Sequence, residues 1–352
     1  MKKKVALIAG VGGTCGANLA EMLLADASEG WQVIGLSRTR PELKVDIDHR
    51  PVDLLDPSQC ETGLGDLSAV THIFWTALLN GKTREEENQL NARMFVNFMD
   101  AALPRIDALE HVHVLEGVKQ YGYDLGPYKT PCREDDPAGQ PPYFYVDQHA
   151  YTLKCQQGAD WGWSTTRPGA VCGYSYGGRI NLMTVLAAYA TIMKELGEPL
   201  YFPGDEATFN ALTFATDVGL LNRMMVWAST DPRAANQAFN AANGDHFRWC
   251  HMWPAIAAMF DMPAGPVRTT RLTEFMADKG PLWQSIIEKH GLEKTELQKI
   301  APWGYADTVF RRYWDNGIST VKANQFGFTE MIDSYQMMQR IFDEFRAQRV
   351  IP

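Results

Sequence analysis

The sequence has no Cys-x-x-Cys pair, no low-complexity tract and no long uninterrupted apolar run. Its few cysteines are scattered along 352 residues, at Cys15, Cys60, Cys132, Cys155, Cys172 and Cys250. This spacing suggests neither a zinc site nor a disulfide framework, and we expect free thiols in a reducing compartment. Because no stretch reaches the roughly 18 to 20 apolar residues that span a bilayer, we expect a soluble, cytoplasmic protein.

Basic residues are in the minority, with 33 Lys and Arg against 42 Asp and Glu and a formal net charge of −9. This balance repels phosphate backbones and anionic lipid head groups, so we expect neither a nucleic-acid nor a membrane partner. The basic start of the chain resembles a signal peptide, but Gly10 interrupts the following apolar run too early. With 45% hydrophobic and 21% charged residues, the chain is expected to be globular throughout.

A glycine-rich segment follows the first predicted strand. Residues 5–9 are all apolar, which predicts a strand buried on both faces of a parallel sheet, and residues 17–24 have helical apolar spacing. In such a unit, glycines permit a tight turn, close approach to a pyrophosphate and close helix packing. The candidate cofactor-binding residues of this turn are Gly10, Gly12, Gly13, Thr14, Cys15 and Gly16. A glycine-rich turn by itself also occurs in βα units that bind no cofactor.

The end of the second predicted strand, residues 31–37, is where a dinucleotide-binding fold distinguishes NAD from NADP. An acidic residue there would favour NAD, but the chain has Ser37, Arg38, Thr39 and Arg40. Hydroxyl and guanidinium groups hold a phosphate by charge-assisted hydrogen bonds, so the segment favours NADPH and assigns Ser37, Arg38 and Thr39 to its site. The alternative is a solvated loop that happens to contain two arginines.

Residues 51–57, 70–77 and 111–115 predict the third, fourth and fifth strands of the parallel sheet. In open α/β sheets, ligands bind at the carboxyl ends of the strands. The remaining candidate cofactor contacts are Asp53, Leu54, Thr76, Ala77, Leu115, Tyr145 and Val171. Residues 85–103 predict a helix, and we interpret the acidic run at residues 85–87 as its solvated first turn and not as a metal site.

Two further pairs of residues have spacings that resemble those of metal or catalytic sites. His111 and His113 lie on one face of the fifth predicted strand, but no third ligand is evident. We interpret them as strand histidines satisfied by their neighbours, and we predict no metal site. Tyr151 and Lys154 share a helix face, although the tyrosine–lysine pair of short-chain reductases is spaced by four residues. The alternative for this pair is a packed tyrosine beside a surface lysine.

Several short motifs, taken together and in order, have the pattern of one family. They are Gly10 to Gly16, Ser37-Arg38, Glu87-Asn88 with Asn91 and Met94-Phe95, Gly117 to Tyr121, Tyr143 to Tyr145, Arg167 to Gly169, and residues 238–240 with 243–245. With these motifs, essentially the whole chain resembles the progesterone 5β-reductase and iridoid synthase family, an atypical branch of the extended short-chain dehydrogenases/reductases. The resemblance implies a Rossmann-type, doubly wound α/β fold and NADPH-dependent 1,4-reduction of a C=C bond conjugated to a carbonyl.

The resemblance also implies the catalytic residues, which are Lys119 after the fifth strand and Tyr145 in a Phe-Tyr-Tyr segment. It further implies that hydride goes to the β-carbon, that Tyr145 stabilises the enolate oxygen by a hydrogen bond, and that Lys119 favours the required phenol state and anchors the ribose. The chain departs from the family at Val146, in place of the second tyrosine, and at His149-Ala150, in place of an acidic pair. These departures concern the mouth of the pocket and therefore the substrate preference.

The second half of the chain is expected to supply the substrate pocket. Residues 182–193, 218–227 and 252–260 predict helices rich in Met, Phe and Trp, which suit a small hydrophobic enone or enal. By the resemblance, Phe326 and Phe328 close over the substrate.

We therefore divide the chain at residue 175. Residues 1–175 are the expected dinucleotide-binding Rossmann domain with the catalytic residues. Residues 176–352 are the smaller, mostly helical substrate-binding and lid region, of which some segments return to the Rossmann sheet. The oligomeric state is not set by the sequence, and a homodimer stays open.

Three functions compete at this point. The first is the enone reductase with Lys119 and Tyr145. The second is a carbonyl reductase or an epimerase-like enzyme that uses Tyr151 and Lys154 on the same scaffold. The third is a non-catalytic, NADPH-binding regulator. The first is favoured because Lys119 and Tyr145 lie in matched motifs, whereas the Tyr151 pair does not.

Overall fold

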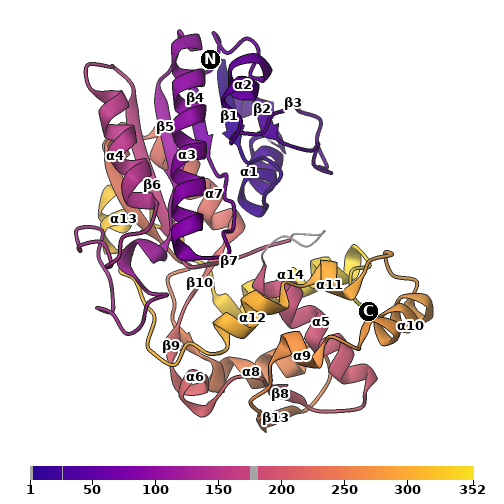
Figure 1. The fold of residues 1–352 in the computed structure, drawn as a ribbon. Coiled ribbons are helices and arrows are strands. Elements are labelled where there is room, and N and C mark those ends of the chain that lie inside the picture. Colours follow the sequence, from indigo (N-terminus) through magenta and orange to yellow (C-terminus); the bar gives the residue numbers. More distant parts are fainter. Residues whose placement is uncertain (1–2, 26, 175–180) are drawn as a thin grey trace.

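The computed structural model describes residues 3–25, 27–174 and 181–352. A seven-stranded parallel sheet forms its upper half in Figure 1. Its strands are β1 (Lys4–Ala9), β2 (Trp31–Ser37), β3 (Asp48–Pro51), β4 (His72–Trp75), β5 (His111–Leu115), β6 (Gly162–Pro168) and β11 (Gln237–Ala241). Their order is β11-β6-β5-β4-β1-β2-β3, and every neighbouring pair is parallel. The chain therefore reverses its direction across the sheet between β1 and β4, where such folds bind ligands.

The predicted first, second and fifth strands are confirmed, and the fourth is shorter than residues 70–77. The prediction of the third strand at residues 51–57 is wrong, since β3 ends at Pro51, where the predicted strand begins. The reason is local hydrogen bonding. Asp53 accepts from the N–H of Leu55 at 3.0 Å, and Asp56 caps the next helix by accepting from the N–H of Ser58 at 2.9 Å. These carboxylates hold a turn that an extended chain cannot form.

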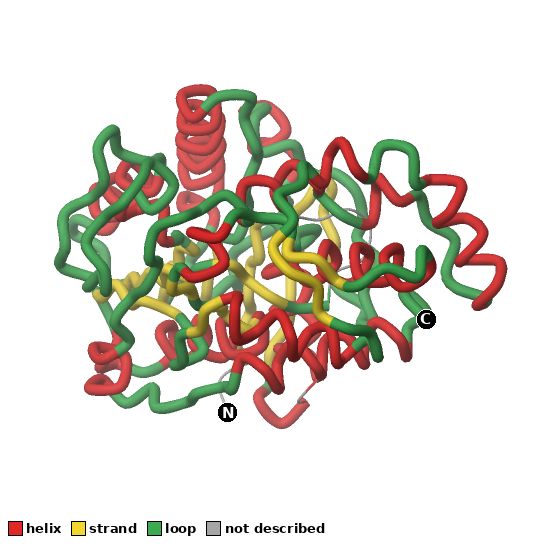
Figure 2. Tube along the Cα trace, turned by 90° about the horizontal axis from the view of Figure 1, so that it is seen from below, coloured by secondary structure: helices red, strands yellow, loops and turns green. Residues whose placement is uncertain are grey.

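Helices cover both faces of the sheet, as Figures 1 and 2 show. They are α1 (Thr14–Ala25), α2 (Pro57–Gly63), α3 (Arg84–Ala102), α4 (Tyr145–Gln156) and α7 (Val218–Thr230). Alternate residues of β1 point to opposite faces, so Leu7 joins the core beneath α2 and α3 and Ile8 joins the core beneath α1 and α7. Both side chains are completely buried, as expected for a central parallel strand. The doubly wound α/β fold is confirmed.

The second half of the chain forms a mainly helical region below the carboxyl edge of the sheet (Figure 1). Its helices are α5 (Leu182–Glu195), α6 (Glu206–Asn210), α8 (Trp249–Met259), α9 (Leu272–Phe275), α10 (Gly280–His290), α11 (Leu297–Ile300), α12 (Trp303–Val309) and α14 (Ser334–Ala347). The short helix α13 (Val321–Phe326) instead lies against β11 of the sheet. Short two-stranded pairs join β7 (Ala170–Cys172) to β10 (Ala215–Asp217), β8 (Leu200–Phe202) to β13 (Ala264–Val267), and β9 (Leu212–Thr213) to β12 (Phe247–Arg248).

The two halves are interleaved, because β11 and α7 come from the second half of the sequence but belong to the sheet. β11 pairs with β6 along five residues, and α7 lies against α1. The helical region has its own core, in which Trp253 and Phe342 are fully buried. None of the helices in the described part of the chain is both long and apolar enough to cross a membrane.

Candidate functional site

The glycine turn between β1 and α1 is locked against the end of β4. Gly10 has φ +90°, and a Cβ on it would lie 2.6 Å from the Cα of Ala77. A Cβ on Gly16 would lie 2.5 Å from the carbonyl oxygen of Gly10 and 2.7 Å from Oγ1 of Thr76. Thr76 in turn donates to the carbonyl of Ala9 at 2.9 Å. The turn is therefore as tight as predicted, and glycine is required at these two positions.

The first turn of α1 has the donors that a pyrophosphate needs. The N–H of Gly13 bonds to Gly10 and that of Ala17 bonds to Gly13. By contrast, no acceptor within the described residues is paired with the N–H groups of Gly12, Cys15 or Gly16. Free N–H groups at the start of a twelve-residue helix form an anion-binding site. The turn thus fits the phosphates of a dinucleotide.

The end of β2 presents a second group of polar side chains. Ser37 donates to the carbonyl of Thr39 at 2.8 Å, and its Oγ lies 3.0 Å from Nε2 of His49 on β3. Arg40 is engaged by Asp46 at 2.6 Å. The guanidinium of Arg38, in contrast, has no ion pair among the described residues and stays available to an anion.

The other candidate cofactor contacts lie beyond the ends of further strands. Asp53 and Leu54 follow β3, where Leu54 is buried and its carbonyl accepts from Asn97 at 3.1 Å. Leu115 is the last residue of β5, and Val171 is in β7 after β6. These residues therefore lie along the carboxyl edge of the sheet.

Lys119 does not hydrogen-bond to Tyr145 but to two residues that sequence reasoning did not assign. Lys119 follows β5 in the short helix η3 (Val118–Tyr121), and its Nζ donates to the hydroxyl of Tyr143 at 2.9 Å and to Oε1 of Glu87 at 3.2 Å. The hydroxyl of Tyr143 also donates to Glu87. The three side chains form a closed cluster in which the carboxylate compensates the ammonium charge.

The interpretation of residues 85–87 as a solvated turn is wrong for Glu87, whose side chain is only 13% exposed. The sequence pattern that could have identified Glu87 was its helical spacing to Asn91, Met94 and Phe98, which are all buried on one face of α3. Asn91 fixes this face by donating to the carbonyl of Leu79 at 2.7 Å.

Tyr145 is the first residue of α4, and its hydroxyl lies against the backbone after β5. A Cβ on Gly117 would be 3.1 Å from this hydroxyl, so glycine leaves room for it. The hydroxyl has no hydrogen-bond partner within the described part of the chain, and its ring packs edge-on to Tyr143 at 4.8 Å. Burial first, and then the carboxylates of Glu116 and Glu87, raise the pKa of Tyr145. The phenol is therefore protonated at neutral pH and can donate one hydrogen bond.

A buried ion pair holds the segment that carries Lys119. Arg167 at the end of β6 donates to Glu116 at 2.6 Å and to the hydroxyl of Tyr121 at 3.1 Å. Burial opposes the charge of Glu116, but Arg167 keeps the pKa of this carboxyl below its usual range. His149, one of the departures from the family pattern, lies one turn after Tyr145 with Nδ1 3.5 Å from Glu116.

Other candidates have structural roles. Tyr151 donates to Asp100 of α3, and Lys154 lies over its ring at 5.2 Å, so the pair is not a catalytic dyad at the sheet edge. His111 and His113 are buried, and both bond to Ser164 at 2.8 Å, as the interpretation as satisfied strand histidines predicted.

Two further expectations concern the proposed phenylalanine lid and Cys15. Phe326 and Phe328 pack on Phe239 and Trp227, in the core shared with β1 and α7, so the expectation of a substrate lid is wrong for them. Cys15 is a free thiol, as expected, and burial raises its pKa to about 12, so it stays protonated at neutral pH.

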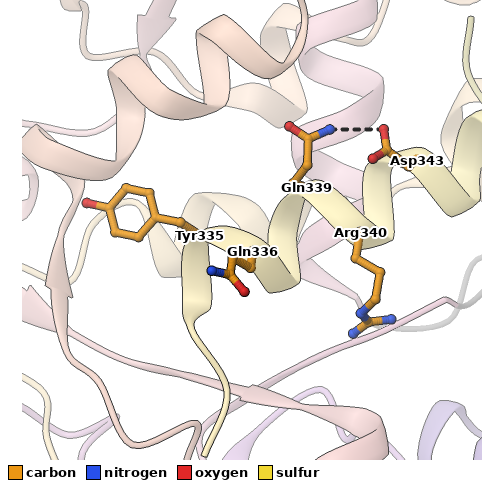
Figure 3. Close-up of a pocket in the computed structure, with 5 residues that line it drawn as sticks. All are labelled: Tyr335, Gln336, Gln339, Arg340 and Asp343. Carbon is orange, nitrogen blue, oxygen red and sulfur yellow. Dashed lines mark hydrogen bonds between the residues drawn. The ribbon is translucent and has the colours of Figure 1, made fainter.

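An open groove runs along α14 and is lined by Tyr335, Gln336, Gln339, Arg340 and Asp343 (Figure 3). Gln339 donates to Asp343 at 2.9 Å, and Arg340 pairs with Asp217, the cap of α7. The groove contains none of the predicted site residues.

The chain is similar to proteins of one family along nearly its whole length. A family model described as a PRISE-like Rossmann-fold domain matches residues 47–352. The (S)-8-oxocitronellyl enol synthase of Camptotheca acuminata is 33% identical, over 99% of this chain and 94% of its own. The enzyme of the same name from Catharanthus roseus is 33% identical over 99% and 93%. The 3-oxo-Delta(4,5)-steroid 5-beta-reductase of Arabidopsis thaliana is 30% identical over 99% and 94%.

Solved structures share the fold at low sequence identity. The UDP-glucose 4-epimerase of Thermotoga maritima, solved with UDP-glucose, superimposes with a TM-score of 0.68 at 11% identity, over 97% of this chain and 99% of its own. The UDP-glucose 4-epimerase of Thermus thermophilus, solved with NAD, has a TM-score of 0.65 at 16% identity, over 97% and 99%. These likenesses show the extended Rossmann architecture and nothing finer.

Proposed function

This chain belongs to the PRISE-like Rossmann-fold family, with the iridoid synthases and steroid 5β-reductases, and is an oxidoreductase; we propose that it reduces C=C bonds conjugated to a carbonyl, with NADPH as the reductant. The observation that carries this proposal is the hydroxyl of Tyr145. It is protonated, has no hydrogen-bond partner among the residues that the structure describes, and lies beside Gly117 at the carboxyl edge of the sheet. One unused donor at this position suits one developing oxyanion.

The residues that would hold the cofactor are those of the glycine turn and the end of β2. The N–H groups of Gly12 and Cys15 would bind the pyrophosphate, and Ser37 and Arg38 would bind the 2′-phosphate. Bound there, NADPH would supply the hydride for the β-carbon of the substrate.

The protein's own part in the reaction is to stabilise the charge that moves to the carbonyl oxygen. Tyr145 donates a hydrogen bond to this oxygen as the enolate forms, and one such donor contributes about 3 to 4 kcal/mol. Lys119 is held in place by Tyr143 and by Glu87, which balances its charge, and its ammonium group favours the phenol state that the reaction needs. The enolate then takes a proton at its α-carbon, so enone, NADPH and one proton give the saturated ketone and NADP⁺.

Two observations favour this reaction over reduction of the carbonyl itself. Carbonyl reduction would depend on Tyr151, but the hydroxyl of Tyr151 already donates to Asp100. Furthermore, the steroid 5β-reductase relative is named for a substrate whose Δ4,5 double bond is conjugated to a 3-oxo group, and this chain would take a substrate with the same conjugated unit.

NADPH consumption tests the proposal directly. Purified protein is given 2-cyclohexenone, a citral-type enal or progesterone, and in parallel the matched saturated ketones, and NADPH absorbance is followed. We expect consumption with the conjugated substrates alone and its loss in Tyr145→Phe. Consumption with the saturated ketones would instead indicate a carbonyl reductase, and tight NADPH binding without consumption would indicate a regulator.

A further inference from the structure

We propose that His49 recognises the 2′-phosphate of NADPH together with Ser37 and Arg38, and so sets the preference for NADPH over NADH. This inference rests on the proposed use of NADPH and adds a residue to its site. His49 lies on β3, twelve residues after Ser37, and no motif of the sequence pointed to it.

The sheet register places His49 on the same face as the glycine turn. β2 and β3 are parallel with Gly35 opposite His49, so the side chains of Ser37 and His49 project to one face. The imidazole Nε2 is 3.0 Å from Ser37 Oγ. Ser37 also lies against the glycine turn, since a Cβ on Gly12 would be 3.4 Å from the Cβ of Ser37. His49 is thus linked through one side chain to the turn that would hold the pyrophosphate.

The hydrogen-bond network assigns the proton of the imidazole. Ser37 has one hydroxyl hydrogen and donates it to the carbonyl of Thr39 at 2.8 Å. Nε2 of His49 is then the donor to Ser37 Oγ. A phosphate bound at Ser37 would accept this Nε2–H in place of the Ser37 hydroxyl, in addition to the N–H groups of the Arg38 guanidinium.

The charges around His49 leave it free to respond to an anion. Burial and the nearby Arg40 lower the pKa of His49, whereas a hydrogen bond to the backbone of Ser37 and then the charge of Asp48 act against them. Both of these neighbours already have partners, Arg40 with Asp46 at 2.6 Å and Asp48 with Arg50 at 2.8 Å. A dianionic phosphate beside the ring would favour the imidazolium, so NADPH binding would take up a proton, and NADH binding would not.

Equilibrium binding of NADPH and NADH, with 2′,5′-ADP and 5′-AMP as fragments, tests the inference without any turnover. We expect His49→Leu to weaken NADPH and 2′,5′-ADP about tenfold at pH 6.5 and to leave NADH and 5′-AMP within about twofold. His49→Gln keeps an N–H donor without the charge, so its loss of NADPH affinity should be smaller. The preference of His49→Gln for NADPH over NADH should also vary less with pH than the preference of the wild type.

The comparison between variants is made at each pH, because the 2′-phosphate itself titrates near pH 6. Equal losses for NADPH and NADH would overturn the inference, since they would mean that His49 only supports β3. An unchanged NADPH affinity in both variants would also overturn it. A wild type that binds NADH as tightly as NADPH would refute the proposed cofactor itself, which is a distinct result.

Discussion

The ammonium group of Lys119 lies 2.9 Å from the hydroxyl of Tyr143, and the hydroxyl of Tyr145 on the neighbouring ring has no partner among the described residues. Two tyrosines that are two positions apart therefore differ in what their hydroxyl groups do. That of Tyr143 joins a partly buried ion pair, whereas that of Tyr145 stays available to a ligand. The two Tyr→Phe substitutions should separate stability from catalysis.

Tyr145→Phe should reduce kcat for an enone by about 10²- to 10³-fold, because it removes the donor to the enolate oxygen. The free energy of unfolding should change little, since the Tyr145 hydroxyl makes no hydrogen bond within the described part of the chain. Steady-state kinetics and urea unfolding of the same preparation provide both quantities. A variant that keeps its kcat would exclude Tyr145 from the chemistry.

Tyr143→Phe should lower the free energy of unfolding by about 1.5 to 3 kcal/mol, because its hydroxyl bonds to charged Lys119 and Glu87. Urea unfolding measures the loss, with Tyr313→Phe as the matched control, since Tyr313 is 56% exposed. If Tyr143→Phe is as stable as the control, the cluster does not hold Lys119.

Gly10→Ala should destabilise the protein by about 2 kcal/mol or more. The residue has φ +90°, and the new methyl group would lie 2.6 Å from the Cα of Ala77. Gly12→Ala is the control, because its Cβ would make only an ordinary 3.4 Å contact with Ser37. We expect this second variant to keep its thermal midpoint and to bind NADPH more weakly, as shown by unfolding and titration. Equal stabilities of the two variants would contradict the tight turn.

The buried histidines of β5 should make the protein sensitive to mild acid. Burial first, and then a neighbouring histidine, lower the pKa of His111 to about 3 and that of His113 well below its usual value. In the unfolded chain, histidine titrates near 6.5, so the unfolded state takes up protons first as the pH falls. The free energy of unfolding should therefore be intact above about pH 6.5 and fall by about 1.4 kcal/mol per pH unit for each histidine below it.

Urea unfolding at pH 7.5 and pH 5.5 measures this difference. The wild type should lose about 3 kcal/mol between the two, and His113→Asn should lose about 1.4 kcal/mol less. The variant is compared with itself at the two pH values, so its own destabilisation cancels. An identical loss in both proteins would place the acid sensitivity elsewhere.

Local patterns in the sequence were sufficient for much of the framework. The apolar runs predicted β1, β2 and β5, because a strand buried on both faces needs no partner to be recognised. The glycine turn and the motif around Lys119 were likewise recognised from residues that are adjacent in the sequence. The third strand was misplaced because Asp53 and Asp56 form turn and cap hydrogen bonds that compete with an extended chain.

Only the tertiary structure decided which side chains meet at the site. Glu87 reaches Lys119 across 32 residues because α3 presents its buried face to the segment after β5. His49 reaches Ser37 because β2 and β3 pair in one particular register. Such contacts arise from the packing of whole elements, and periodicity within a single element carries no information on the partner it will face.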